Sequence, residues 1–321
     1  MKNSSIGNLS VGKATLYSVI ITFLILAGCA SENKSTVTKS STFIGGSEGV
    51  TVEFLENAPP AEVFDNNTYP FDVSVKLENK GEYDVPREQI KVILSGIDRK
   101  EFNNPPASLN PDENLEKSRI DSNGKVVQGT VAYVNFPNLI YKENLPGNTP
   151  FIIRADLCYQ YGTIAQARMC VRNDLTSIEE GVCDPSGQKI VVSSGAPVQV
   201  SNFEQSPAGK KKVTFSFDIE HKNNGLISRK DKDCSDDLDN KNRVLVTVDT
   251  GDLTSKLSCA GLEGGNSRTS GYVNLYNGKR NVRCTQDLEG ASGDFEKIVN
   301  IKLNYAYKNH VSANLLVKDN E

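Results

Sequence analysis

Six of the seven cysteines could form covalent cross-links within the chain: Cys158, Cys170, Cys183, Cys234, Cys259 and Cys284. No Cys-x-x-Cys motif and no closely spaced pair of histidines occurs, so the spacing argues against a zinc site and against a redox-active thiol pair. An even number of cysteines is typical of a disulfide framework in an exported protein. Six cysteines allow fifteen connectivities, so the count alone leaves the pairing open.

Alternation of side chains suggests a first disulfide. In segment 151–161, Cys158 belongs to the polar set of alternating residues, and Cys170 belongs to the polar set of the segment that follows. A hairpin turn near 162–166 would place the two cysteines opposite each other, with Cβ atoms about 4 Å apart. The expected pairs are therefore Cys158–Cys170, then Cys259–Cys284 by position in the second half, and Cys183–Cys234 by remainder.

Acidic residues gather in segment 228–242, which we call the insert because the corresponding part of the first half is shorter. Its five carboxylates belong to Asp231, Asp233, Asp236, Asp237 and Asp239. They could surround Ca²⁺, which takes about six to eight oxygen ligands, but the Asp-x-Asp-x-Asp-Gly spacing and trailing Glu of a calcium loop are missing. We therefore expect a solvated loop and no cofactor. A Ca²⁺ site and a partner-binding loop are the alternatives.

The two histidines, His221 and His310, do not stand beside a nucleophile motif. His221 falls at an inward strand position, which favours a half-buried, hydrogen-bonded ring over an acid–base catalyst. No Gly-x-Ser-x-Gly, His-Glu-x-x-His or phosphate-binding loop occurs either. We expect a protein without catalytic activity, and an exported hydrolase that uses two of the 40 acidic residues is the alternative.

The N-terminal residues have the parts of an export signal. Lys2 and Lys13 flank a short polar start, an apolar run covers 14–26, and small residues lead to Cys29. Leu26-Ala27-Gly28-Cys29 resembles the prokaryotic lipobox, which implies cleavage before Cys29 and a diacylglyceryl group on its thiol. An uncleaved signal anchor is the alternative, although the segment from Ala14 to Ala30 has only about 17 residues, which is short for a membrane span. The resemblance implies an extracytoplasmic protein anchored to the cell membrane by lipid.

Segment 29–42 is rich in Ser, Thr and Lys and lacks apolar periodicity, so we expect a flexible tether. Glycosylation sequons begin at Asn33 and Asn66, and they matter only in a host that glycosylates exported chains. The net charge of −4, with both signs intermixed, argues against a nucleic-acid partner.

The folded part of the chain contains a repeat. Alternating apolar residues in 71–77 lead to Asn79-x-Gly81, and 215–221 leads to Asn223-x-Gly225 at an offset of 144 residues. Leu157-x-Tyr159-x-Tyr161 likewise recurs 146 residues later as Leu303-x-Tyr305-x-Tyr307, which predicts core tyrosines at matched positions. Tandem self-similarity at this period indicates duplicated domains. The expected all-β organisation is a signal peptide 1–28, a tether 29–42, and antiparallel β-sandwiches over 43–183 and 184–321.

The repeated pattern of Pro, a gap, alternating apolar residues and Asn-x-Gly resembles the immunoglobulin-like modules of prokaryotic envelope proteins, including the CARDB type associated with cell adhesion. This resemblance implies two tandem immunoglobulin-like sandwiches that bind a protein or glycan at the cell surface, or that serve in an envelope assembly. It transfers no functional residue. A structural subunit of a surface filament or layer is the alternative, although the tether is too polar for a good donor strand.

Overall fold

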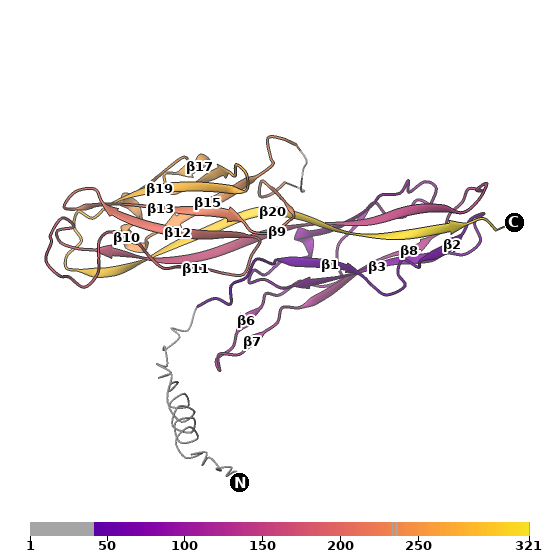
Figure 1. Cartoon of the computed structure of the whole chain (residues 1–321), viewed down its shortest axis with the longest axis horizontal. Coiled ribbons are helices and arrows are strands. Elements are labelled where there is room, and N and C mark those ends of the chain that lie inside the picture. The colour runs from indigo at the N-terminus through magenta and orange to yellow at the C-terminus, as the bar shows by residue number, and fades with distance from the viewer. Residues whose placement is uncertain (1–41, 233, 235–236, 321) are drawn as a thin grey trace, which may run out of the picture. The chain divides into compact units, whose positions relative to one another are not determined.

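The computed structural model describes residues 42–232, 234 and 237–320 (Figure 1). The predicted signal peptide and the tether up to residue 41 lie outside these residues. The predicted sites Cys29, Asn33, Asp233 and Asp236 also lie outside them. Within the described part, the chain forms antiparallel β-sheets and two short 3-10 segments, η1 (Arg87–Gln89) and η2 (Gly251–Lys256), and it has no α-helix. The predicted all-β class is therefore confirmed, in agreement with the abundance of β-branched and turn residues.

One large sheet, which we call the shared sheet, contains strands from both repeats. Its main path is β17 (Glu263–Ser267), β18 (Ser270–Asn274), β15 (Arg243–Asp249), β20 (Phe295–Lys318), β9 (Thr149–Val171), β4 (Ile90–Ser95) and β5 (Ser108–Leu109). Three short strands join it from the side: β11 (Val191–Ser193) on β9, and β14 (Leu226–Ser228) and β2 (Glu62–Phe64) on β20. Among the strands of the described residues, only the β2–β20 pairing is parallel.

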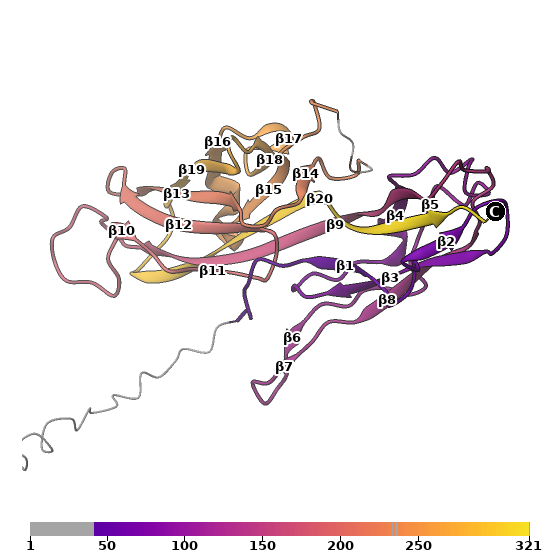
Figure 2. The ribbon, with the colours of Figure 1, turned by 45° about the vertical axis from the view of Figure 1, so that its right-hand side comes forward.

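Three smaller sheets complete the fold. The first is β1 (Val50–Phe54), β3 (Phe71–Asn79) and β8 (Val131–Leu139). The second is β10 (Gly187–Gln188), β12 (Val198–Pro207), β13 (Lys212–His221), β19 (Lys279–Asp287) and β16 (Leu257–Ala260). The third is a separate hairpin of β6 (Arg119–Ile120) and β7 (Val126–Val127). Figure 2 shows the first two sheets beside β9 and β20.

The strands β9 and β20 relate the two repeats. They pair antiparallel over their whole length, from Thr149↔Val317 to Val171↔Phe295. The central pair joins Gln160 to Ala306, its own repeat equivalent at the offset of 146 residues. On either side of this pair, the pairing of Tyr159 with Tyr307 is matched by the pairing of their repeat equivalents, Tyr305 and Tyr161. The two repeats are related by a local two-fold axis that passes between β9 and β20.

This arrangement differs from the predicted pair of consecutive sandwiches, 43–183 and 184–321. The C-terminal part of β20 belongs to the second repeat by sequence, yet it pairs beside the strands of the first repeat. The described residues from 42 onward accordingly form one compact unit. Alternation predicts which face of a strand is buried, but it does not identify the neighbouring strand, so the exchange of strand ends was missed.

The core lies on the face of the shared sheet that carries odd-numbered residues of β9 and β20. The tyrosines Tyr159, Tyr161, Tyr305 and Tyr307 occupy its centre and are fully buried, as the repeat predicts. The backbone N–H of Val50 donates to the Tyr159 hydroxyl at 3.0 Å, and that of Val198 donates to the Tyr305 hydroxyl at 3.2 Å. Because Val50 begins β1 and Val198 begins β12, the tyrosines fasten the three-stranded and the five-stranded sheet to the same face.

The repeated Asn-x-Gly turns make room for the other two tyrosines. A Cβ atom on Gly81 would lie 2.2 Å from the Tyr161 hydroxyl, and one on Gly225 would lie 2.4 Å from the Tyr307 ring. The Tyr161 hydroxyl donates to Asn79 Oδ1 at 3.0 Å, and the Gly225 N–H donates to the Tyr307 hydroxyl at 2.8 Å. Glycine is required at both turns because a ring and a backbone approach each other there.

Candidate binding loops

The opposite, even-numbered face of the shared sheet carries the insert. Cys158 of β9 forms a disulfide with Cys234, and the N–H of Asp231 donates to the Gln160 side chain at 3.2 Å. Cys158, Cys234 and Ala306 form a small buried cluster of their own. The insert is therefore fastened over the local two-fold axis.

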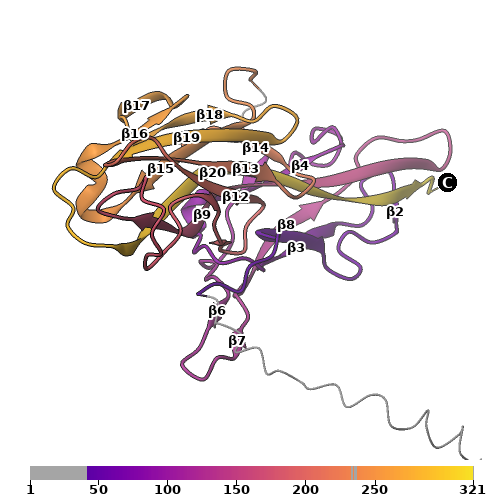
Figure 3. The same cartoon turned by 60° about the vertical axis from the view of Figure 1, so that its left-hand side comes forward.

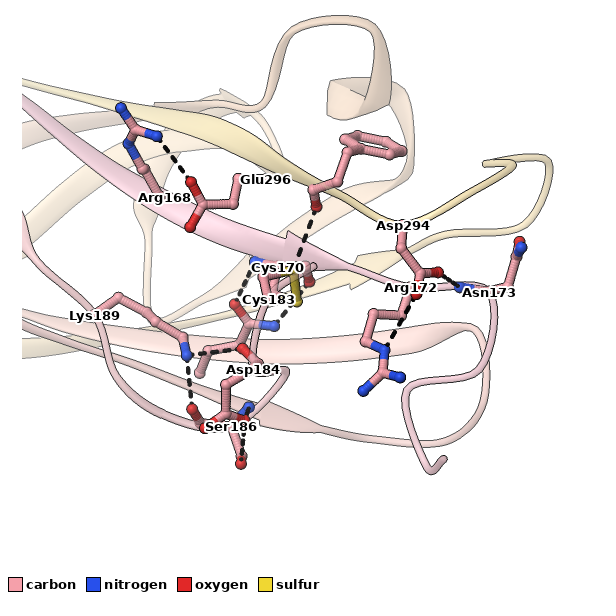
Figure 4. The surroundings of a disulfide bond; sticks show 12 residues. Arg168, Cys170, Arg172, Asn173, Cys183, Asp184, Ser186, Lys189, Asp294 and Glu296 are labelled. Atoms are coloured by element: carbon pink, nitrogen blue, oxygen red, sulfur yellow. Dashed lines mark hydrogen bonds and ion pairs between the residues drawn. A yellow bond between two sulfur atoms is a disulfide. The ribbon is translucent and has the colours of Figure 1, made fainter. Parts of the chain in front are cut away.

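The 172–186 loop is fastened in the same way at the end of β9. Cys170 forms a disulfide with Cys183, 13 residues further along the chain (Figure 4). The buried Arg172 guanidinium lies 3.4 Å from the Asp294 carboxylate and donates to the Glu179 carbonyl at 2.8 Å. Since Arg172 holds the loop from inside and the disulfide holds its return, the loop has a defined course over the sheet.

The disulfide pattern corrects two of the three expected pairs. Cys158–Cys170 and Cys183–Cys234 are wrong, whereas Cys259–Cys284 is right and joins facing positions of β16 and β19. The expected hairpin near 162–166 does not exist, because β9 continues straight through it. Cys158 and Cys170 do share one face, but twelve residues of extended strand hold them about 40 Å apart.

Both fastened loops expose an aliphatic side chain next to acidic residues in the sequence. In the 172–186 loop, Ile178 is 101% exposed and precedes Glu179 and Glu180. In the insert, Leu238 is 84% exposed and stands between Asp237 and Asp239. The 172–186 loop also borders a surface pocket of ≈ 540 Å³. Exposed apolar side chains on covalently restrained loops are suited to contact another protein.

The acidic residues of the insert do not converge in the described part of the chain. Asp237 accepts hydrogen bonds from the N–H of Asp239 at 3.2 Å and from the Asn240 amide at 3.3 Å, so its carboxylate closes a local turn. Among residues 42–232, 234 and 237–320, no three His, Cys, Asp or Glu side chains form a group that could hold a metal. The Ca²⁺ alternative therefore has no support from Asp231, Asp237 and Asp239.

Other predicted site residues lie apart from these loops. His310 is exposed. His221 is half-buried, and its Nε2 lies 3.0 Å from the Tyr307 hydroxyl. Asn66 is exposed and follows β2, so its glycosylation stays a prediction. In the described residues, which omit 1–41, 233, 235–236 and 321, no helix is long and apolar enough to cross a membrane.

Burial makes His221 a determinant of acid stability. Burial lowers the pKa of the His221 ring below its usual value. The unfolded state therefore binds more protons than the folded state near pH 6, and acid favours unfolding. We expect the free energy of unfolding to fall below about pH 6.5, by less than about 1.4 kcal/mol per pH unit because the ring is partly solvated. Urea denaturation between pH 5 and 7, compared with His221→Gln, measures this slope. An unchanged slope in the variant would contradict the assignment.

Sequence reasoning missed the 172–186 loop because the stretch was taken for a boundary between domains. Its signal was the short spacing of Cys170 and Cys183 together with two isolated aliphatic residues, Ile178 and Val182, in a polar segment. The insert was singled out correctly as a surface loop, but its attachment to Cys158 was not predicted. Both attachments depend on the straight course of β9.

No protein-family model and no curated protein matches the chain. Several solved structures show weak similarity to the chain, including the following two. Serine-rich repeat adhesion glycoprotein Srr1 from Streptococcus agalactiae is 9% identical, with 88% of this chain and 99% of that chain covered and a TM-score of 0.18. The collagen binding domain of Erysipelothrix rhusiopathiae surface protein RspB is 9% identical, with 85% and 90% covered and a TM-score of 0.11. Neither similarity bears on function at these scores, and the resemblance to CARDB-type modules stays a prediction.

Proposed function

We propose that this chain is an extracytoplasmic lipoprotein, anchored by a lipid on Cys29, that binds a protein partner through the insert and the 172–186 loop and catalyses no reaction. The observation that carries the proposal is the covalent attachment of both loops to β9. A restrained loop loses little conformational freedom when it binds, so more of its contact energy contributes to affinity.

The location is supported by the cysteines. Three disulfides are typical of exported proteins, because cytosolic thiols are kept reduced. The lipobox at Cys29 supplies the anchor, and a diacylglyceryl group has the two chains that stable tethering needs. Mass spectrometry of the mature N-terminus tests the anchor. An unmodified Cys29 thiol or an intact Met1 would refute it.

The chemistry of the two loop tips suggests the partner. Ile178 precedes Glu179 and Glu180, and Leu238 stands between Asp237 and Asp239, so each loop tip offers an aliphatic side chain next to acidic residues in the sequence. A complementary surface has an apolar depression with Lys or Arg at its rim, and that arrangement fits a protein better than a neutral glycan.

A pull-down from native envelopes tests the binding loops. We expect Ile178→Arg or Leu238→Arg to weaken partner capture roughly tenfold or more, as expected for central apolar contacts. Leu226→Arg is the matched control, since Leu226 is an exposed leucine of β14 outside both loops. Point substitutions are preferable to deletion of the insert, which would remove Cys234 and uncover Ala306. Equal capture by wild type and both loop variants, quantified by mass spectrometry, would overturn the proposal.

A further inference from the structure

The hairpin of β6 and β7 is a small two-stranded sheet with apolar side chains exposed to solvent. Ile120, Val126 and Val127 are 37%, 40% and 36% exposed. The Asp121 carboxylate accepts the N–H groups of Asn123 and Lys125 at 2.8 and 2.9 Å and thereby closes the turn. A two-stranded hairpin in water is marginal in stability, so apolar residues here are best explained by a surface that covers them.

The base of the hairpin adjoins the start of the described chain. The N–H of Ser118 donates to the Gly81 carbonyl at 2.8 Å, and the N–H of Lys80 donates to the Gly49 carbonyl at 2.9 Å. The backbone N–H groups of Ile44 and Gly45 donate to the Glu82 carboxylate at 3.0 and 2.9 Å. The chain thus enters the fold at the turn after β3 from which the hairpin projects.

The reach of the tether brings this entry point close to a membrane. The twelve residues 30–41 between Cys29 and the described chain can span at most about 40 Å. The hairpin extends about 17 Å from Ser118 to its turn. A lipid on Cys29 therefore keeps the hairpin within range of the bilayer surface. The N-terminal tether alone would leave the orientation of the protein undefined.

We propose that the β6–β7 hairpin is a second membrane contact, which rests on the lipid anchor proposed for Cys29. The side chains of Ile120 and Val126, which face each other across the hairpin, enter the interfacial region of the bilayer to a depth of about 5–10 Å. Arg119, Lys125 and the Asp121 carboxylate at the turn stay among the headgroups. Two exposed ion pairs near the base, Lys117–Asp84 at 3.4 Å and Arg119–Glu116 at 3.8 Å, are too weak to oppose this contact.

The contact sets the direction in which the insert points. The hairpin arises from the three-stranded sheet, which covers the odd-numbered face of the shared sheet, whereas the insert lies on the even-numbered face. Figures 2 and 3 show the hairpin projecting from the side of the fold opposite β14, where the insert begins. A hairpin on the membrane therefore presents the insert to the outside.

Depth-dependent fluorescence quenching tests the contact. The mature lipoprotein, with a thiol-reactive fluorophore on Val126→Cys, is reconstituted without reductant into phosphatidylcholine vesicles with and without nitroxide-labelled lipid. We expect the nitroxide to quench this fluorophore and to leave the same fluorophore on Leu226→Cys, near the insert, unquenched. Adding Ile120→Asp to the Val126→Cys protein should reduce the quenching several-fold, because a carboxylate is costly in the interfacial region.

The outcomes separate the two proposals. A vesicle-bound protein whose Val126→Cys label stays unquenched would overturn the hairpin contact and leave the lipid anchor intact; such a hairpin would instead face a protein. A protein that does not stay with the vesicles would overturn the anchor and the hairpin contact together. Quenching at Val126→Cys that Ile120→Asp reduces supports both.

Discussion

Tyr159→Ala is expected to destabilise both halves of the fold at once, by about 3–5 kcal/mol. Tyr159 is buried between Tyr161 and Tyr307, with ring centroids 5.5 and 5.8 Å away. Those two neighbours belong to different repeats, and β9 lies beside strands of both repeats. Loss of the ring therefore weakens the packing of the first repeat and the second together. Urea unfolding followed by tyrosine fluorescence and hydrogen exchange measures the effect.

The matched control is Tyr159→Phe, which keeps the ring and removes the hydroxyl. That change leaves the buried N–H of Val50 without its acceptor and should cost about 1–3 kcal/mol. In Tyr159→Ala, amide protection should fall in parallel in β3 and β13, which lie in different sheets. Protection lost in β3 but retained in β13 would show that the halves unfold separately.

Removal of the Cys158–Cys234 disulfide should have the second large effect. Its cysteines are 76 residues apart, and the chain-entropy model gives a loss of about 4.5 kcal/mol for a cross-link of that span. Cys170–Cys183 closes only 13 residues, for which the same model gives about 3 kcal/mol. The double variant Cys158→Ser/Cys234→Ser should accordingly have a lower midpoint of urea unfolding than Cys170→Ser/Cys183→Ser.

The same variants separate stability from binding. Below its midpoint, Cys158→Ser/Cys234→Ser should remain folded and yet lose partner capture, because the insert is no longer restrained. Cys259→Ser/Cys284→Ser is the control, since that disulfide joins two strands and fastens neither loop. Equal capture by wild type and Cys158→Ser/Cys234→Ser would mean that attachment of the insert has no part in recognition.

Local patterns in the sequence predicted the parts of the fold that depend on neighbouring residues. The expected inward residues Phe71, Val73, Val75 and Leu77 are all buried, and so are their counterparts Phe215, Phe217 and Ile219. Alternation is reliable there because each strand has one buried and one exposed face. The all-β class follows directly from these strands.

Partners far apart in sequence were less predictable, and Gly162 shows why. It suggested a turn, but it lies within β9, where a Cβ atom would be 2.5 Å from the Tyr83 ring. This glycine permits close packing, which cannot be distinguished from turn formation by sequence alone. Once β9 is straight, Cys158 and Cys170 separate and each finds a partner in a loop. The candidate binding loops could therefore be located only from the structure.

The central pairing of β9 with β20 has a consequence for the origin of the chain. The pairing is symmetric about Gln160 and Ala306, so that each contact between the repeats occurs a second time with the two repeats interchanged. This is the contact pattern of an isologous homodimer. A protein made of one repeat would have to associate with a second copy to complete this sheet. Gene duplication and fusion would turn that obligatory dimer into a monomer. Fusion would also free one copy to acquire an insert on the former symmetry axis, where a homodimer has no room for two.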